Sequence, residues 1–308
     1  MAEEIFRSEN ITKRYSNHLA LDEVSITVEK QSIFGLLGPN GAGKTSLIRI
    51  INQITAPDSG TAYFNGEPLN AAHIGHIGYL PEERGLYKKM KVGEQALYLA
   101  QLKGLEKAVA LERLKDWFVK LEIQGWWNKN VEELSKGMQQ KIQFVITVLH
   151  EPKLLIFDEP FSGFDPINTE LIKNEILKLR ENGATIIFST HNMESVEELC
   201  DHIALIDNSK KILDGKLKDI RSSHKSNTYT IGFRGDFAAL KKGLDGHKLI
   251  EERGDEDLNR AKIRLADGAR LNTLLQGVLP HIEVEFCTEL IPSIRDIFIE
   301  EVKENKGR

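Results

Sequence analysis

The chain has 308 residues, which suits about two domains, and its 41% hydrophobic and 28% charged residues predict a globular protein with a full core. A net charge of −5 argues against a nucleic-acid partner. Cys200 and Cys287 lack CxxC spacing, which excludes a disulfide framework or zinc site and suits a cytosolic protein. No signal peptide is expected at the acidic N-terminus, and no stretch has the about 18–20 apolar residues that span a bilayer.

The first part of the chain has the pattern of strands followed by an α/β unit. Residues 1–30 are expected to form short strands, because apolar and polar residues alternate near 26–28. Residues 32–37 form a continuous apolar run, and a glycine-rich turn follows. Apolar residues then recur at helical spacing, at Leu47, Ile50, Ile51 and Ile54. Strand, loop and helix in this order are typical of the entry to an α/β sheet.

Residues 85–150 are predicted to be mainly helical. Apolar residues recur at helical spacing near 92–99, 114–121 and 138–149. Ser135 is expected to cap the third of these helices, and Pro152 is expected to end it.

After residue 152, short apolar runs alternate with helical patterns. Strands are expected at 154–157 and 184–189, and helices at 169–179 and 193–199. This alternation predicts a parallel sheet that is covered on both faces.

The polar stretch at 221–227 is interpreted as a linker between two domains, residues 1–222 and 223–308. The second domain is expected to be a small α+β unit, in which basic and acidic residues nearly balance. Its strands are expected at 229–233, 262–265 and 282–286, and its helices at 271–278 and 294–302.

The glycine-rich turn fits the phosphate-binding pattern G-x-x-x-x-G-K-[ST] at every fixed position. Glycines let the backbone approach phosphates closely, and successive N–H groups at a helix start bind anionic oxygens. Lys44 would contact the β and γ phosphates of ATP, and the Thr45 hydroxyl would bind Mg²⁺. The pattern predicts phosphate binding by Gly38, Pro39, Asn40, Gly41, Ala42, Gly43, Lys44, Thr45 and Ser46.

Two carboxylates follow the buried strand at 154–157. Ligands in α/β sheets sit beyond the carboxyl ends of the strands, so Asp158 is placed to hold Mg²⁺. Glu159 points elsewhere and is available to polarise the attacking water. Alternatively, Asp-Glu-Pro forms only a solvated turn. His191, after the next strand, would either contact the γ phosphate and the water or serve a structural role.

These motifs together resemble the nucleotide-binding domain of the ABC ATPase superfamily over about residues 4–220. Tyr15 stands where the family has an aromatic residue that stacks on adenine. Leu134-Ser135-Lys136-Gly137-Met138 occupies the place of the LSGGQ signature. Ser162-Gly163-Phe164-Asp165 and Ser189-Thr190-His191 resemble the loops after the two strands. Five motifs in the family's order make the resemblance specific.

The resemblance implies a fold class and an assembly. The α/β fold would be a P-loop NTPase core with a mainly parallel sheet, an N-terminal antiparallel β subdomain and a helical subdomain at about 85–150, followed by the α+β domain. In the family, Ser135 and Gly137 would act in trans on the ATP of a second subunit. Two subunits would then enclose two ATP molecules head to tail and open after hydrolysis.

The chain departs from the family pattern at four positions. Lys136 and Met138 replace a Gly and a Gln of the signature, and Phe164 replaces a Leu. Glu82 stands where the family has a Gln that reaches Mg²⁺ and whose loop faces the membrane partner. A carboxylate at this position is expected either to bind Mg²⁺ or to be an exposed acid of a surface loop.

Two segments resemble ATP-binding subunits of bacterial ABC-2-type exporters, including the sodium-export group. They are Pro81-Glu82-Glu83-Arg84-Gly85 and the C-terminal segment near 292–299. This resemblance implies an ATPase, peripheral on the cytoplasmic face of the cell membrane, that forms a homodimer or heterodimer and serves a separate transmembrane permease subunit. The alternatives are a soluble ABC ATPase that remodels a cytosolic complex and a nucleotide sensor without turnover. The second domain would pack or stabilise the dimer, or sense an ion or the partner.

Overall fold

The computed structural model describes residues 3–83, 85–254 and 258–306. Their contacts divide the chain into two compact units. One comprises residues 1–217 together with 301–308, and the other comprises residues 218–300. The division falls at residue 217, whereas the sequence placed the boundary at 222, and the last residues return to the first unit.

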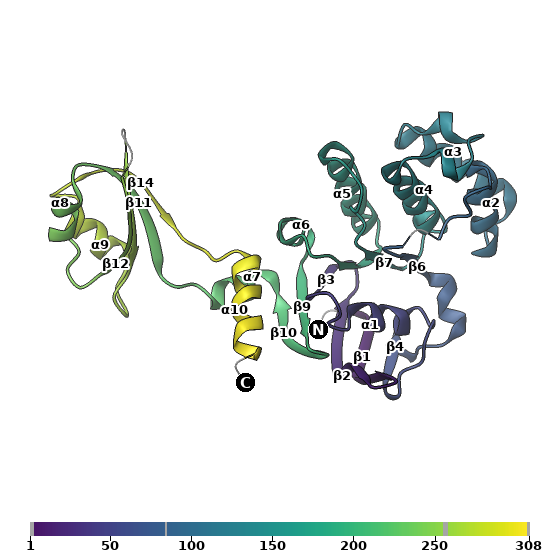
Figure 1. Ribbon diagram of the computed structural model, residues 1–308, viewed down its shortest axis with the longest axis horizontal. Coiled ribbons are helices and arrows are strands. Elements are labelled where there is room, and N and C mark those ends of the chain that lie inside the picture. Colours follow the sequence, from purple (N-terminus) through teal and green to yellow (C-terminus); the bar gives the residue numbers. More distant parts are fainter. Residues whose placement is uncertain (1–2, 84, 255–257, 307–308) are drawn as a thin grey trace. The chain divides into compact units, whose positions relative to one another are not determined.

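The centre of the first unit is a six-stranded sheet in the order β10-β9-β3-β8-β7-β6 (Figure 1). Neighbouring strands from β9 to β6 are parallel, and only β10 runs antiparallel to its neighbour. The strands are β3 (Ile33–Leu37), β6 (Ile77–Leu80), β7 (Leu154–Asp158), β8 (Thr185–Ser189), β9 (His202–Asp207) and β10 (Lys210–Lys216). The mainly parallel sheet predicted from the apolar runs is confirmed.

A second, antiparallel sheet in the order β2-β1-β4-β5 forms the N-terminal subdomain. Its strands are β1 (Glu4–Tyr15), β2 (His18–Glu29), β4 (Ser59–Phe64) and β5 (Glu67–Pro68). The first two are each 12 residues long, longer than the short strands that the sequence indicated. One apolar cluster joins this sheet, helix α1 (Lys44–Ile51) and one face of the six-stranded sheet.

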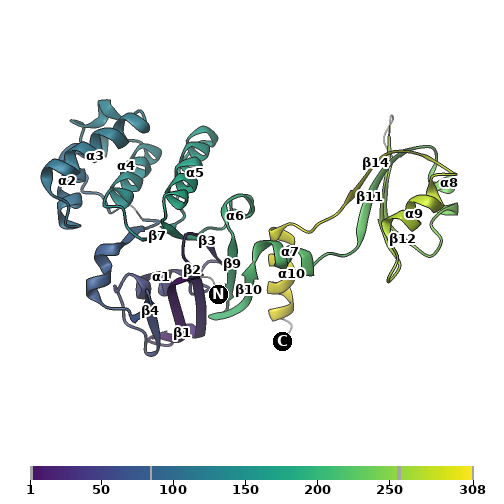
Figure 2. The same ribbon diagram turned by 180° about the vertical axis from the view of Figure 1, so that it is seen from behind.

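Helices cover the other face of the six-stranded sheet. Phe144 packs against Phe157 of β7, and Phe161 packs against Phe188 of β8. Figures 1 and 2 show α2, α3 and α4 grouped as a helical subdomain with α5 beside α4. These helices, with α6, are α2 (Val92–Leu102), α3 (Lys107–Lys120), α4 (Lys136–Val148), α5 (Pro166–Glu181) and α6 (Met193–Leu199), and the short 3₁₀ turns are Ala71–His76, Gln124–Trp126 and Val131–Glu133.

Side-chain caps set the start of several helices, including α4 and α5. Ser135 accepts a hydrogen bond from the Met138 N–H and caps α4, as predicted. Asp165 accepts a hydrogen bond from the Asn168 N–H, and Pro166 follows it. The sequence indicated that α5 starts at Thr169, but this Asp-Pro cap starts it three residues earlier.

The second unit has the order strand, helix, strand, strand, helix, strand. Its antiparallel sheet is ordered β12-β13-β11-β14, and two helices pack on one face around a separate apolar core. The elements are β11 (Thr228–Arg234), α8 (Phe237–Lys242), β12 (Lys248–Arg253), β13 (Asn259–Arg264), α9 (Leu271–Val278) and β14 (Glu283–Glu289). The sequence missed β12 because this edge strand is mostly exposed and lacks an apolar run.

Two helices carry the chain across the division between the units. They are α7 (Leu217–Ser223) and α10 (Ile294–Lys306). At the end of α10, the Asn305 amide donates to the Asp207 carboxylate of β9 over 2.8 Å. This hydrogen bond attaches the end of α10 to the first unit.

Candidate active site

The phosphate-binding loop connects β3 to α1. Gly38 and Gly43 have φ values of 150° and 120°, and a Cβ at either would lie within 2.3 Å of a backbone oxygen of Ile206 or Ala20. Only glycine fits there. The Lys44 ammonium donates to the Gly38 and Pro39 carbonyls over 2.7 and 3.1 Å. No side chain caps the start of α1, which leaves its N–H groups available to an anion.

Asp158 ends β7 as a buried carboxylate, with 4% of its surface exposed. Its pKa is raised to about 6, chiefly by burial and also by the carboxylates of Glu82 and Glu159, while the nearby Ser189 hydroxyl and the charge of Lys44 oppose the shift. Burial also lowers the pKa of Lys44, although the carboxylates of Asp158, Glu159 and Glu82 oppose this. A cation bound beside Asp158 would therefore favour the ionised form of its carboxyl group.

Glu159 is held from two sides at the end of β8. The Thr190 hydroxyl donates to its Oε2 over 3.0 Å, and the His191 backbone N–H donates to its Oε1 over 2.9 Å. The His191 ring Nδ1 lies 2.7 Å from the same Oε1. The Glu159 side chain is 16% exposed, whereas that of His191 is 81% exposed. The ring can therefore move toward a bound ligand while the backbone keeps the carboxylate in place.

These elements surround a cavity of about 340 Å³. It is lined by Tyr15, His18, Ala20, Asn40, Gly41, Gly43, Lys44, Thr45, Ser46, Glu82, Asp158, Glu159 and His191. Most of the predicted site residues thus meet in one cavity. Pro39 and Ala42 do not line it: Pro39 accepts a hydrogen bond from Lys44, and Ala42 is buried.

The oxygen donors of this cavity suit Mg²⁺. Asp158 is a carboxylate whose pKa is raised chiefly by burial, and the Thr45 hydroxyl and Glu82 line the same space. Carboxylate and hydroxyl oxygens are the ligands that a hard cation prefers, and Mg²⁺ usually takes few protein ligands together with phosphates. Among the described residues, no group of three His, Cys, Asp or Glu side chains forms a self-sufficient metal site.

Ser135 and Gly137 lie in a different cavity of about 360 Å³. Lys136, Lys141 and Trp126 also line it, together with the start of α5. A Cβ at Gly137 would lie 2.8 Å from the Gly163 carbonyl oxygen, so the turn before α5 approaches closely. The structure therefore does not bring these two predicted residues to the cavity that Lys44 and Asp158 line.

Sequence reasoning assigned no role to Thr190, which donates to Glu159. It also missed His18 and Ala20 of β2, which line the cavity. Thr190 lies next to His191 in the Ser-Thr-His segment, and a hydroxyl at a strand end was the available signal. His18 and Ala20 carry no local signal, because the pairing of β1 with β2 brings them there.

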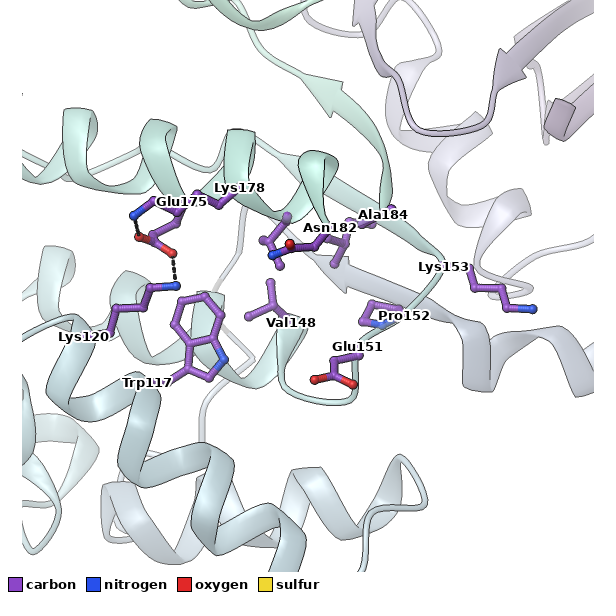
Figure 3. Close-up of a pocket in the computed structure, with 13 residues that line it drawn as sticks. Trp117, Lys120, Val148, Glu151, Pro152, Lys153, Glu175, Lys178, Asn182 and Ala184 are labelled. Atoms are coloured by element: carbon purple, nitrogen blue, oxygen red, sulfur yellow. Dashed lines mark hydrogen bonds and ion pairs between the residues drawn. The ribbon is translucent and has the colours of Figure 1, made fainter. Parts of the chain in front are cut away.

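A third cavity, of about 480 Å³, lies at the amino end of β7 (Figure 3). None of the predicted site residues lines it. Within the described part of the chain, no helix is long and apolar enough to cross a membrane.

Comparison with known proteins identifies the protein family that this chain matches. The ABC transporter family model matches residues 21–162, and the model of the ATP-binding protein DrrA1-3-like C-terminal domain matches residues 215–302. The chain is 42% identical over 303 residues to the ABC transporter ATP-binding protein YhaQ of Bacillus subtilis, covering 96% of this chain and 97% of that one.

More distant relatives carry more specific names. The Nod factor export ATP-binding protein I of Cupriavidus metallidurans is 34% identical over 71% of this chain and 73% of its own length. Among solved structures, an ATP-binding subunit of an ABC transporter superposes with a TM-score of 0.66 at 30% identity, covering 71% of this chain and 92% of that one.

Proposed function

Because the chain belongs to the family of ABC transporter ATP-binding proteins, we propose that it binds ATP and Mg²⁺ in the cavity between the phosphate-binding loop and β7 and hydrolyses ATP to ADP and phosphate. The observation that carries this proposal is the Glu159 carboxylate, which Thr190 and His191 hold at the same cavity as Lys44. A fixed carboxylate beside a phosphate cradle suits the activation of water.

The residues of the cavity divide the work. Tyr15 stacks on adenine, and residues 38–46 hold the phosphates with backbone N–H groups and the Lys44 ammonium. Asp158, Thr45 and Glu82 hold Mg²⁺, which supplies positive charge to the phosphate oxygens.

Glu159 accepts the proton of the attacking water. Its two hydrogen bonds aim the carboxylate without neutralising it, because the donors are a hydroxyl and a backbone N–H. The exposed His191 ring leaves Glu159 and contacts the γ phosphate when ATP is present.

A second subunit completes the site. Ser135 and Gly137 begin α4 in their own cavity, beside the cationic Lys136 and Lys141, which suits the γ phosphate of another chain's ATP. The pair is a homodimer or heterodimer that closes on ATP and opens after hydrolysis.

The chain binds a separate transmembrane permease subunit and drives it with ATP hydrolysis. It works as a peripheral protein on the cytoplasmic face of the membrane. Support comes from the large apolar side chains Tyr87, Tyr98 and Leu102, which are exposed on and before α2, close in sequence to Glu82. The likeness to a Nod factor export protein supports an exporter.

The Glu159→Gln variant tests this function. It keeps the size of the side chain and one oxygen that can accept from the His191 N–H, but its amide cannot accept the proton of the water. We expect ATP binding within about threefold of the parent, phosphate release at least about 100-fold slower, and an ATP-dependent dimer in light scattering.

The matched control is Glu112→Gln, which removes one exposed carboxylate of α3 outside the cavity. It should hydrolyse ATP like the parent. Ordinary turnover by Glu159→Gln would remove Glu159 from its role as the base.

A further inference from the structure

The cavity of about 480 Å³ lies at the opposite end of β7 from Asp158. Leu155, which lines it, precedes Asp158 by three residues, or about 10 Å along the strand. Its walls are the end of α3 and the second half of α5, and the end of α4 closes its floor (Figure 3). Its volume lies within the range of about 300–1,000 Å³ that is usual for small-molecule sites.

One end of this cavity carries a surplus of positive charge. The Glu175 carboxylate of α5 is 2% exposed and pairs with Lys178 over 2.8 Å and with Lys120 of α3 (Figure 3). One buried negative charge thus faces two ammonium groups, whose side chains remain 42% and 56% exposed for Lys120 and Lys178. Each ammonium has three N–H donors, so both have donors left for a ligand.

Between its charged and polar side chains, the cavity wall also has an aromatic and apolar part. The Trp117 indole forms one side, with the Lys120 ammonium 4.5 Å from its ring centre. Val148, Leu155 and Leu179 supply apolar surface, and the Asn182 amide lies at the rim. Such a wall fits a flat apolar body of limited size.

The other carboxylate at the cavity, Glu151, does not favour a cation. Arg113 donates to it over 2.8 Å, and its side chain is 72% exposed. Glu175 is already paired twice. Neither carboxylate is left without a cationic partner, whereas both ammonium groups pair with the same acid, Glu175, and Glu181 acts on Lys178 only as a further charge.

We propose that this cavity binds a small aromatic monoanion, a carboxylate or sulfonate, with its charged group at Lys120 and Lys178 and its ring among Trp117, Val148 and Leu179. Such a ligand would bridge α3 of the helical subdomain and α5 of the core. The site is separate from the nucleotide cavity, and the proposal does not depend on ATP hydrolysis.

The test is a fluorescence titration of the full chain with the aromatic sulfonate 8-anilinonaphthalene-1-sulfonate. We expect saturable binding to one site, unaffected by ADP and Mg²⁺. Lys178→Met keeps the side-chain stem but removes the charge and should weaken binding about fivefold. Leu179→Trp should fill the cavity and weaken binding at least about tenfold.

The matched control is Lys115→Met, which removes an exposed lysine of α3 that does not line the cavity. It should change the dissociation constant less than twofold. Thermal unfolding of each variant verifies that it is folded. The proposal is overturned if the probe does not bind, if ADP displaces it, or if Lys178→Met and Lys115→Met bind it equally well.

Discussion

Asp158 and Glu175 are both buried carboxylates of the first unit, with 4% and 2% of their surfaces exposed, but their surroundings differ. Glu175 has two lysines of its own chain as partners. Near Asp158 the one lysine, Lys44, donates instead to the carbonyls of Gly38 and Pro39. Two further acids face Asp158 and raise its pKa.

The difference separates a structural acid from one that awaits a ligand. An ionised carboxylate is costly to bury unless a cation neutralises it. The chain supplies both cations for Glu175, whereas the Mg²⁺ and phosphates proposed to lie beside Asp158 would come from outside the chain. The two ends of β7 therefore differ in how far the chain's own charges neutralise a buried acid.

The largest effect is expected from Lys44→Ala, which removes the cation that the acids of the nucleotide cavity share. Asp158, Glu159 and Glu82 would then face the triphosphate without an ammonium group. We expect ATP to bind about 100-fold more weakly in equilibrium titration with a fluorescent analogue. Unchanged affinity would contradict the phosphate cradle. Lys153→Met, outside this cavity, is the control.

Asp158→Asn should change how the free energy of unfolding depends on pH, which tests the contrast between Asp158 and Glu175. The folded pKa of Asp158, about 6, exceeds the ordinary 3.8, so the folded protein binds this proton more tightly than the unfolded chain. The free energy of unfolding should therefore fall as pH rises from about 4 to 6, by about 2–3 kcal/mol at most. The variant should lose this fall in urea unfolding without Mg²⁺. An identical pH dependence in both proteins would show that Asp158 is not the titrating group.

Glu175→Ala should destabilise the fold without weakening ATP binding. It leaves two lysines without their shared acid, and because both are about half exposed we expect a loss of about 1–2 kcal/mol in urea unfolding. Glu198→Ala, which removes an acid that pairs with Lys173 but is 55% exposed, should cost less than about 1 kcal/mol. Equal losses would erase the distinction between the two acids.

The smallest effect is expected from Glu82→Gln. Its charge is one of those that raise the pKa of Asp158, so its removal should lower that pKa and shift the pH-dependent fall in stability toward acid. The shift should correspond to less than about 1 kcal/mol, because Glu82 is exposed. Glu83→Gln, which removes the adjacent exposed acid, should leave the midpoint in place.

The sequence predicted those parts of the site that are local in the chain. The phosphate-binding loop and the acids after β7 are short segments, and the parallel sheet brings the strand ends together. The cavity beside Trp117 and Glu175 had no such signal, because it gathers residues from 117 to 184 through helix packing. A lysine and a glutamate 55 positions apart, such as Lys120 and Glu175, carry no pattern that identifies them as partners.

The fold shows the same division. Apolar runs predicted β3, β7 and β8, which are buried along their whole length. Edge strand β12 was missed, because its polar and exposed residues resemble a loop. Helical spacing also predicted most of α10, but nothing in that spacing indicates that its end bonds to Asp207.

The return of residues 301–308 to the first unit makes the second unit an insertion rather than an appendage. Stopping the chain after residue 217 would discard Asn305 and leave Asp207 without that amide donor. An internal deletion variant that joins residue 217 to residue 301 through a short glycine-serine linker would keep the hydrogen bond from Asn305 to Asp207. To separate the roles of the two units, residues 218–300 should be deleted internally. A stop codon after residue 217 would also remove the part of α10 that belongs to the first unit.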